Sequence, residues 1–278
     1  MRFLSVCTTV LVLALSGCAN LQAVQEFGQI SSLSAGYTRL SEDYARSPLV
    51  NQTYTLESET QQRSVLDAEY QQRLPQAAQL QLYHKAVANY MAALADLAAD
   101  DVPTGAEEVD GLVHAAVKAN HLSESAAAPA KAIGKLLTDA ALNGYRHREL
   151  KKVIAEGNQP IQTVLASLVQ SMQAFDASMK IERANATRYY RSLHARAREN
   201  NREPVAAEWA WASLRAANTQ FDQREQAIPL YITSLQRIAT AHQALYDGRE
   251  HIDNQQLLAD LKRYTKQIRA AYSAARAN

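Results

Sequence analysis

Hydrophobic side chains recur every three or four positions along most of this chain, which is the spacing that places them on one face of a helix. The pattern predicts helices over 30–46, 56–100 and 158–199, another from the loop ENNREP at 199–204 to Leu245, and a last one over 253–277. No long segment shows the two-residue alternation of a half-buried strand. We therefore expect an all-α fold.

The segment 102–157 carries shorter hydrophobic runs, so we expect a small insert of short helices there. Thr104 and Glu107 have the spacing of a capping box, in which each side chain accepts a free backbone N–H of the other residue. Pro129 and Gly144 are expected to bracket the second short helix of this insert.

Glycine and proline set the remaining predicted boundaries. Gly157 is expected to end a third short helix, and Pro160 to lie in the first turn of the helix that follows, where proline is favoured. The first helix of the chain should end before Pro48, because the residue before a proline is biased away from helical backbone angles. Pro75 and Pro229 lie inside long hydrophobic patterns, where the lost hydrogen bond predicts kinks.

Two long helices joined by a short loop run antiparallel. Each has a hydrophobic stripe too wide for one neighbour, so we expect the other helices to complete an elongated antiparallel bundle with long kinked helices. The later stripe has the regular spacing of coiled-coil-like packing, and Arg224 and His242 interrupt it. Folding the hairpin about residue 201 places Arg224 opposite 179–183, and we predict an ion pair with Glu182.

The first 18 residues have the features of an export signal. Arg2 precedes an apolar run from Phe3 to Ala14, which is shorter than the ~20 residues of a membrane-spanning helix and typical of a signal peptide. The sequence Leu15-Ser16-Gly17-Cys18 resembles the lipobox of bacterial lipoprotein precursors. The resemblance implies that residues 1–17 are removed, that Cys18 carries the lipid, and that 18–278 form a single all-helical domain.

The same resemblance implies a location. Ala19 stands where the inner-membrane retention residue of this family is aspartate, so the outer membrane is expected, with the protein facing the periplasm. Cys7 would be lost with the signal peptide, which leaves no second thiol and therefore no disulfide. A domain of this length does not need one, because its hydrophobic core is large enough.

Charge and composition exclude several classes of function. Lys and Arg number 29 against 28 Asp and Glu, so no long-range field attracts the chain to nucleic acid. Only nine glycines are present, and we find no phosphate-binding loop, dinucleotide-binding motif, nucleophile elbow or zinc-binding cysteines. His114 and His121 lie about 10.5 Å apart along a helix, too far to bind one metal ion. We expect no catalytic centre, no cofactor and no metal site.

The clearest candidate for binding is a basic cluster near the end of the long hairpin. It consists of Arg188, Arg191, His194, Arg198 and Arg202, and basic residues beside aromatic ones are typical of surfaces that contact anionic partners. The alternative is a solvated helix end whose arginines pair with nearby acids. These acids are Glu199, Glu203 and Glu208.

Trp209 and Trp211 follow this cluster in the chain. Residues two apart on a helix point about 200° from each other, so both indoles cannot enter the same seam. We expect one indole in the core and the other either against a third helix or in contact with a partner.

These features favour a non-enzymatic envelope lipoprotein, held on the membrane by a lipid at Cys18, whose rigid bundle is a scaffold, adaptor or docking module for an envelope protein. The alternative is a small-ligand or lipid-binding bundle, in which helices splay at the prolines to form an apolar pocket. Nucleic acid is not an expected partner, and the sequence leaves open whether the outer helices close on a second copy of the chain.

Overall fold

The computed structural model describes residues 21–103, 105–118, 122–143, 146–199 and 203–277. This part of the chain is almost entirely helical and contains no strand, which confirms the all-α prediction. A helix over 21–35 comes first. It is followed by α2 (Arg39–Gln52), α3 (Thr60–Ala98), α4 (Ala106–Lys118), α5 (Glu124–Leu142), α6 (Arg146–Glu199), α7 (Pro204–Asp247), one turn of 3₁₀-helix (Arg249–His251) and α8 (Gln255–Ala277).

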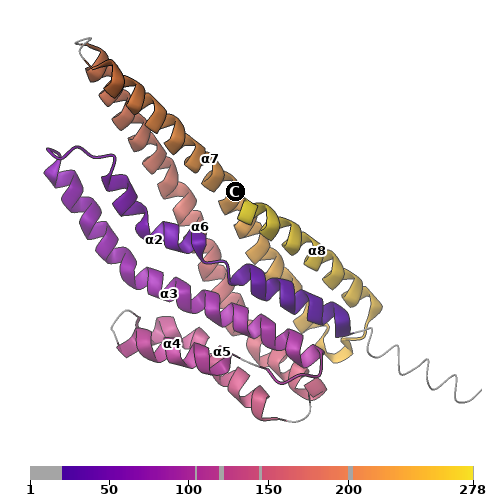
Figure 1. Cartoon of the computed structure of the whole chain (residues 1–278). Coiled ribbons are helices and arrows are strands. Elements are labelled where there is room, and N and C mark those ends of the chain that lie inside the picture. Colours follow the sequence, from indigo (N-terminus) through magenta and orange to yellow (C-terminus); the bar gives the residue numbers. More distant parts are fainter. Residues whose placement is uncertain (1–20, 104, 119–121, 144–145, 200–202, 278) are drawn as a thin grey trace, which may run out of the picture.

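The two longest helices, α6 and α7, form an antiparallel pair that runs the length of the molecule (Figure 1). At about 1.5 Å per residue, the 54 residues of α6 span about 80 Å. α8 packs along α7, α3 packs along α6 together with α2, and α4 and α5 cover one side of α3. α3 and α7 continue through Pro75 and Pro229. The elongated bundle of long helices with a small helical insert is therefore confirmed.

The bundle is thick at one end and narrows to the α6–α7 pair at the other (Figure 1). The start of the helix over 21–35 and the α7–α8 connection lie at the thick end. α2 and α3 turn back before the α6–α7 pair ends, so the last turns of this hairpin extend beyond the other described helices.

The first predicted helix is two helices in the structure. The helix over 21–35 ends before Gly36, and α2 continues through Pro48 instead of ending before it. A proline at this position leaves the backbone oxygen of Tyr44 without its helical partner, and Nη1 of Arg73 donates to that oxygen at 2.7 Å. A side chain of α3 therefore supplies the hydrogen bond that the proline removes.

A histidine of α3 holds the break between these two helices. Nδ1 of His84 lies 2.6 Å from the backbone oxygen of Ala35, the last residue of the helix over 21–35. Because a carbonyl oxygen can only accept, Nδ1 carries the proton and donates. Nε2 then accepts from the hydroxyl of Ser41 in α2, at 2.7 Å. One buried imidazole thus fastens both helices to α3.

The insert over 102–157 differs from its prediction at the start of its second helix. α5 begins well before Pro129, which lies inside the helix. Its N-cap is Ser123, whose hydroxyl accepts a backbone N–H of the first turn at 3.2 Å. Thr104 and Gly144, which were predicted to mark other boundaries of the insert, lie outside the described residues.

α6 continues through Gly157 and Pro160, where the sequence predicted the end of one helix and the start of another. The glycine serves packing, because a Cβ at Gly157 would lie 2.4 Å from Cε2 of the Tyr90 ring on α3. It therefore allows α3 and α6 to approach closely and does not end a helix. The Tyr90 hydroxyl also lies 2.7 Å from Nε2 of His242 on α7, so this contact joins three helices.

A single hydrophobic core extends through the bundle from the helix over 21–35 to α8. Truncating a buried aromatic ring in such a core costs about 3–5 kcal/mol, so the rings fix how the helices pack. The largest are Phe27, Tyr90, Phe175, Phe221 and Tyr231.

The close contact at Gly157 gives a stability prediction. Gly157→Ala forces the Tyr90 ring to move, and we expect a loss of about 1–3 kcal/mol in the free energy of unfolding. Gly111→Ala on α4 is the matched control, because nothing lies within 4 Å of the added Cβ, and it should stabilise by about 0.5–1 kcal/mol. Urea unfolding followed by circular dichroism measures both, and stabilisation by both substitutions would contradict the packing role.

Candidate functional site

The free end of the α6–α7 hairpin has little cover. We define the hairpin tip as residues 191–199 and 203–213, and the connection between α2 and α3 reaches only its base (Figure 1). Within the described residues of the tip, only Ala207 and Ala210 are fully buried. A seam of alanines brings two helices together but covers only one face of each. The other faces are open to a partner.

Both indoles of the tip are exposed, which corrects the prediction that one of them enters the core. Trp209 is 59% exposed and Trp211 is 40% exposed. Ala210 occupies the seam between them, and the described part of the chain places no third helix over the tip. Each indole nevertheless rests on a ring of α6: the centroids of Trp209 and Tyr190 lie 6.3 Å apart, and those of Trp211 and His194 lie 5.5 Å apart.

The arginines of the predicted basic cluster lie close to these rings in the chain. Arg188, Arg191 and Arg198 are exposed, and in the described part of the chain none of them forms an ion pair. Arg202 lies outside the described residues, as does the predicted lipid-bearing Cys18. The alternative prediction was that these arginines pair with Glu199, Glu203 and Glu208. Those ion pairs are absent among the residues that the structure describes.

The hairpin end is positively charged although the whole chain is nearly neutral. The segment 188–215 contains six arginines and three glutamates, against 29 basic and 28 acidic residues overall. A local excess of one sign attracts partners of the opposite sign to that end of the molecule.

A cleft that the sequence did not predict opens at the base of the tip, between α6 and the connection from α2 to α3. Its larger part has a volume of about 800 Å³ and its smaller part about 130 Å³. Tyr54, Glu59 and Arg188 line both parts, so the two hollows adjoin each other. We call this hollow the Arg188 cleft. Its one signal in the sequence is the run of hydroxyl and amide side chains over 51–62.

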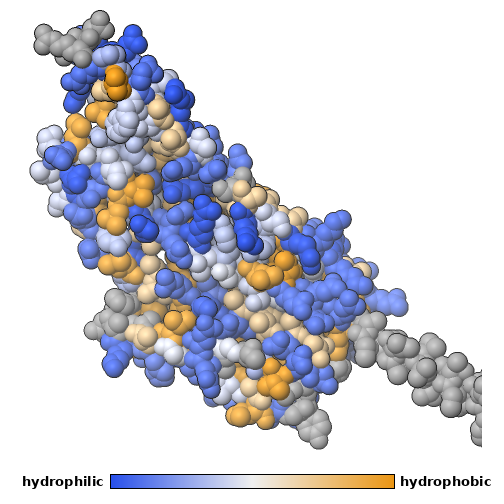
Figure 2. All heavy atoms as spheres, in the orientation of Figure 1, coloured by the Kyte–Doolittle hydropathy of each residue, from blue (hydrophilic) through white to orange (hydrophobic). Residues whose placement is uncertain are grey.

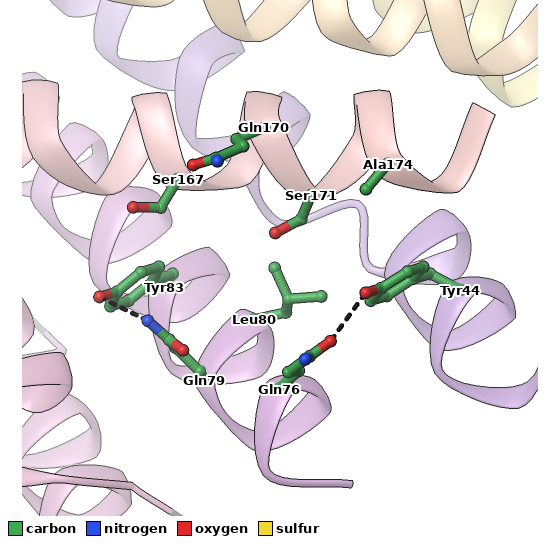
Figure 3. Close-up of a pocket in the computed structure, with 9 residues that line it drawn as sticks. All are labelled: Tyr44, Gln76, Gln79, Leu80, Tyr83, Ser167, Gln170, Ser171 and Ala174. Atoms are coloured by element: carbon green, nitrogen blue, oxygen red, sulfur yellow. Dashed lines mark hydrogen bonds between the residues drawn. The ribbon is translucent and has the colours of Figure 1, made fainter. Parts of the chain in front are cut away.

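A smaller groove of about 320 Å³ lies between α3 and α6 (Figure 3). The Tyr44 hydroxyl donates to Oε1 of Gln76 at 2.7 Å, and Nε2 of Gln79 donates to the Tyr83 hydroxyl at 2.9 Å. That hydroxyl in turn donates to the backbone oxygen of Ala126 at 2.8 Å. The side chains on its α2 and α3 side are thus paired with one another, and its lining is not the apolar one that a lipid ligand requires.

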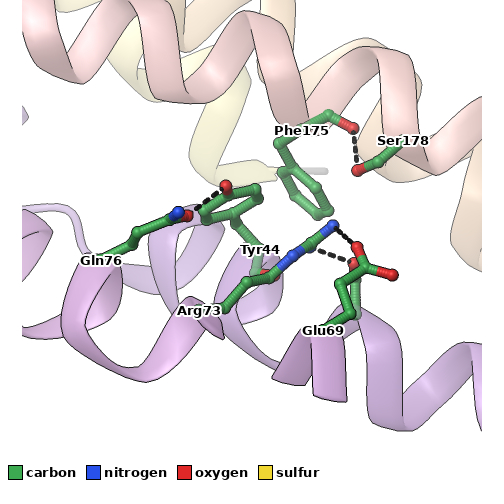
Figure 4. Close-up of polar contacts among 7 residues, drawn as sticks. Tyr44, Glu69, Arg73, Gln76, Phe175 and Ser178 are labelled. Carbon is green, nitrogen blue, oxygen red and sulfur yellow. Dashed lines mark hydrogen bonds and ion pairs between the residues drawn. The ribbon is translucent and has the colours of Figure 1, made fainter. Parts of the chain in front are cut away.

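A buried arginine joins α2 to α3 beside this groove (Figure 4). The Arg73 guanidinium donates to the backbone oxygen of Tyr44 and to Oγ of Ser47, both at 2.7 Å, and to Oε1 of Glu69 at 2.5 Å. It also lies 4.5 Å from the centroid of the Tyr44 ring, whose other contact is the edge of Phe175. These contacts satisfy the charge within the fold, which is a structural role.

The predicted ion pair of Arg224 and Glu182 is confirmed. Nη1 of Arg224 lies 3.9 Å from Oε1 of Glu182, and Nε lies 3.3 Å from Oδ2 of Asp43 on α2. The Glu182 side chain is 2% exposed, and neither of its oxygens accepts a hydrogen bond within the described structure. Burial raises the pKa of Glu182 to about 7, although the charge of Arg224 opposes this shift.

His84 and His242 are the buried histidines of the described chain. Burial lowers the pKa of His84 to about 4 and that of His242 to about 3, so both are neutral near pH 7. Nδ1 of His242 lies 3.0 Å from Oδ1 of Asn158 on α6, and Nε2 lies 2.7 Å from the Tyr90 hydroxyl on α3. Each imidazole is thus a neutral link between helices.

Other kinds of site receive no support from the described residues. No three His, Cys, Asp or Glu side chains there gather closely enough to hold a metal ion. None of the described helices combines the length and apolarity needed to cross a bilayer. Comparisons with known protein families, curated proteins and solved structures found no match for this chain. The hairpin tip and the Arg188 cleft are therefore the candidate sites among the described residues.

The buried carboxyl group gives a pH prediction. Between about pH 4.5 and about pH 7, the folded chain keeps a proton on Glu182 that the unfolded chain has lost, so this group's contribution to stability falls as the pH rises. Glu182→Gln removes that loss. Relative to the wild type, we expect the variant to gain about 1–3 kcal/mol of unfolding free energy between about pH 5 and about pH 8.

Urea unfolding at the two pH values measures this gain. Glu199→Gln, which removes an exposed carboxylate at the hairpin tip, is the control and should show no comparable gain. Equal behaviour of the two variants would mean that Glu182 is not buried as the structure places it.

Proposed function

We propose that this chain is a non-enzymatic envelope lipoprotein, anchored through a lipid at Cys18, that docks on another envelope protein through its hairpin tip. The observation that carries the proposal is the exposure of Trp209 and Trp211 on a two-helix tip, at the end of the molecule opposite the start of the helix over 21–35 (Figure 1). Anchor and docking surface would then lie at opposite ends of one rigid body.

The position of the first described helix supports this polarity. Cys18 precedes residue 21 by three positions, and the helix that begins there lies at the thick end of the bundle. A lipid at Cys18 would therefore hold the thick end at the membrane. α6, about 80 Å long, would place the tip far from the bilayer.

The surface of the tip has the residue types that dominate binding energies. Tryptophan and arginine are enriched among the residues whose truncation weakens interfaces most. Val205, which is 81% exposed, adds a hydrophobic side chain beside them. Figure 2 shows hydrophobic residues among hydrophilic ones at this end of the molecule. Isolated arginines around exposed rings favour a partner whose surface is acidic.

Ion pairs also join the two helices of the hairpin, and an ordered surface favours docking because it loses less conformational freedom on binding. Arg183 of α6 lies 2.8 Å from Oδ1 of Asp222 and 2.7 Å from Oε2 of Glu225, both on α7. These pairs fix the register of the two helices just below the tip. Phe175 and Phe221, both buried, hold the same pair from inside.

Site-specific photocrosslinking tests the docking surface. A benzophenone amino acid at position 209 or 211 should give an adduct with the same envelope protein in whole cells. The same group at Arg269, an exposed position of α8, should not. Adducts that form equally at all three positions, or only at Arg269, would contradict docking through the tip.

The tip variants are expected to fold normally, which separates docking from stability. Trp209→Ala combined with Trp211→Ala should change the unfolding free energy by no more than about 1 kcal/mol, because both side chains are exposed. Phe221→Ala, which empties a buried site on the same helix, should cost about 3–5 kcal/mol. A large loss from the tryptophan pair would point to a structural role instead.

The anchor has its own test. Cys18→Ser removes the sulfur that would carry the lipid, and we expect the variant to move from the membrane fraction to the soluble periplasmic fraction. The wild-type chain, fractionated in parallel, is the control. A variant that remains in the membrane fraction would refute the lipid anchor and leave the crosslinking result to be judged separately.

A further inference from the structure

The Arg188 cleft has a polar lining. Hydroxyl and amide side chains dominate the wall formed by the connection from α2 to α3 and the first turn of α3, and α6 adds two more. These side chains are Thr55, Ser58, Thr60, Gln61, Gln62, Asn185 and Ser192. Such groups both donate and accept hydrogen bonds, so the cleft can pair with a ligand that carries many hydroxyl groups.

Positive charge is placed at the centre of this lining. Arg188 lines both parts of the cleft, and Asn185 orients it: an Arg188 N–H donates to Oδ1 of Asn185 at 3.3 Å, while Nδ2 of Asn185 donates to Oδ1 of Asn51 at 3.1 Å. Its guanidinium has no carboxylate partner among the described residues. Arg196 adds a second guanidinium at the smaller end.

The acidic residue of the cleft is already engaged. Oε2 of Glu59 accepts the backbone N–H of Leu56 at 2.9 Å, which closes the turn before α3. Arg188 and Arg196 outnumber this one acidic residue among the side chains that line the cleft. A planar guanidinium binds a carboxylate through two parallel hydrogen bonds.

Two aromatic rings also line the cleft. Tyr54 lines both parts of the cleft and Tyr189 lines the smaller one, with ring centroids 6.5 Å apart. Phe221 and Tyr190 support the Tyr54 ring from behind, at 6.4 and 5.9 Å. A fixed ring with a polar edge packs against the apolar face of a flat ligand while its neighbours bind the ligand's polar edge.

We propose that the Arg188 cleft binds an acidic oligosaccharide, with a sugar carboxylate on Arg188, sugar hydroxyls on the amide and hydroxyl side chains, and a sugar ring against Tyr189. A peptide bound through its backbone fits less well, because that mode of recognition uses a free strand edge. The walls here are a helix and a turn, and their lining is mainly polar. The proposal depends on neither the lipid anchor nor the docking partner.

Isothermal titration of the full chain in detergent tests this assignment. The probes are trigalacturonate and the disaccharide of N-acetylglucosamine and N-acetylmuramic acid, which carry a sugar carboxylate in two different ways. We expect at least one to bind and Arg188→Ala to weaken that binding about tenfold or more. Arg188→Lys should restore part of the affinity, because it keeps the charge without the planar pair of donors.

One control tests the position of the arginine and another tests the charge of the sugar. Arg191→Ala removes another exposed arginine of α6 that does not line the cleft, and it should leave the affinity unchanged within about twofold. The methyl ester of trigalacturonate keeps the size of the acid without its charge and should not bind. Circular dichroism confirms that Arg188→Ala is folded.

Three outcomes would overturn the proposal. In the first, neither acidic sugar binds at millimolar concentration. In the second, the methyl ester binds as tightly as the acid. In the third, tetraglutamate binds as tightly as the sugars with the same dependence on Arg188, which would assign the cleft to acidic peptides.

Discussion

Two side chains of α3 provide hydrogen bonds that the backbone of the first two helices cannot make for itself. Arg73 donates to the carbonyl oxygen released by Pro48, and His84 donates to the carbonyl oxygen at the end of the helix over 21–35. A buried carbonyl left unpaired costs about 1–3 kcal/mol. With both satisfied, a broken and proline-containing stretch packs along a continuous helix, and this pair of layers supports α6.

The bundle narrows where the layer formed by α2 and α3 turns back. α2 ends and α3 begins at the connection over 53–59, and the Tyr54 ring there contacts Tyr190 and Phe221 of the long pair. Of the helices that the structure describes, α6 and α7 are the ones that continue beyond that contact. The Arg188 cleft lies at this step in thickness, and the exposed indoles lie just past it. Both candidate sites thus follow from where the supporting helices stop.

Periodicity was sufficient to predict what depends on regular helices. It located α7 and α8, most of α3 and the later part of α6, and reflecting the hairpin about its loop paired Arg224 with Glu182. Periodicity failed to predict helix ends where a residue distant in the sequence changes the effect of a glycine or a proline. Gly157 was interpreted as a helix end, yet it faces Tyr90; Pro48 was interpreted as a stop, yet Arg73 replaces its hydrogen bond.

The candidate sites divide in the same way. The exposed arginines could be chosen from sequence because their spacing places them on a hairpin end. The cleft could not, because its second wall comes from a part of the chain far earlier than Arg188. Nor could the exposure of both indoles be predicted, because it depends on how many helices surround the tip, which only the packed structure determines.

The unbroken course of α6 gives the molecule a mechanical property. A sideways force on the free end of the hairpin acts on α6, whose other half packs against α5, α3 and α7. The close contact between Gly157 and the Tyr90 ring lies within that packed half of α6. Because α6 is one helix from Arg146 to Glu199, a displacement of its outer end is passed to the helices that pack around it.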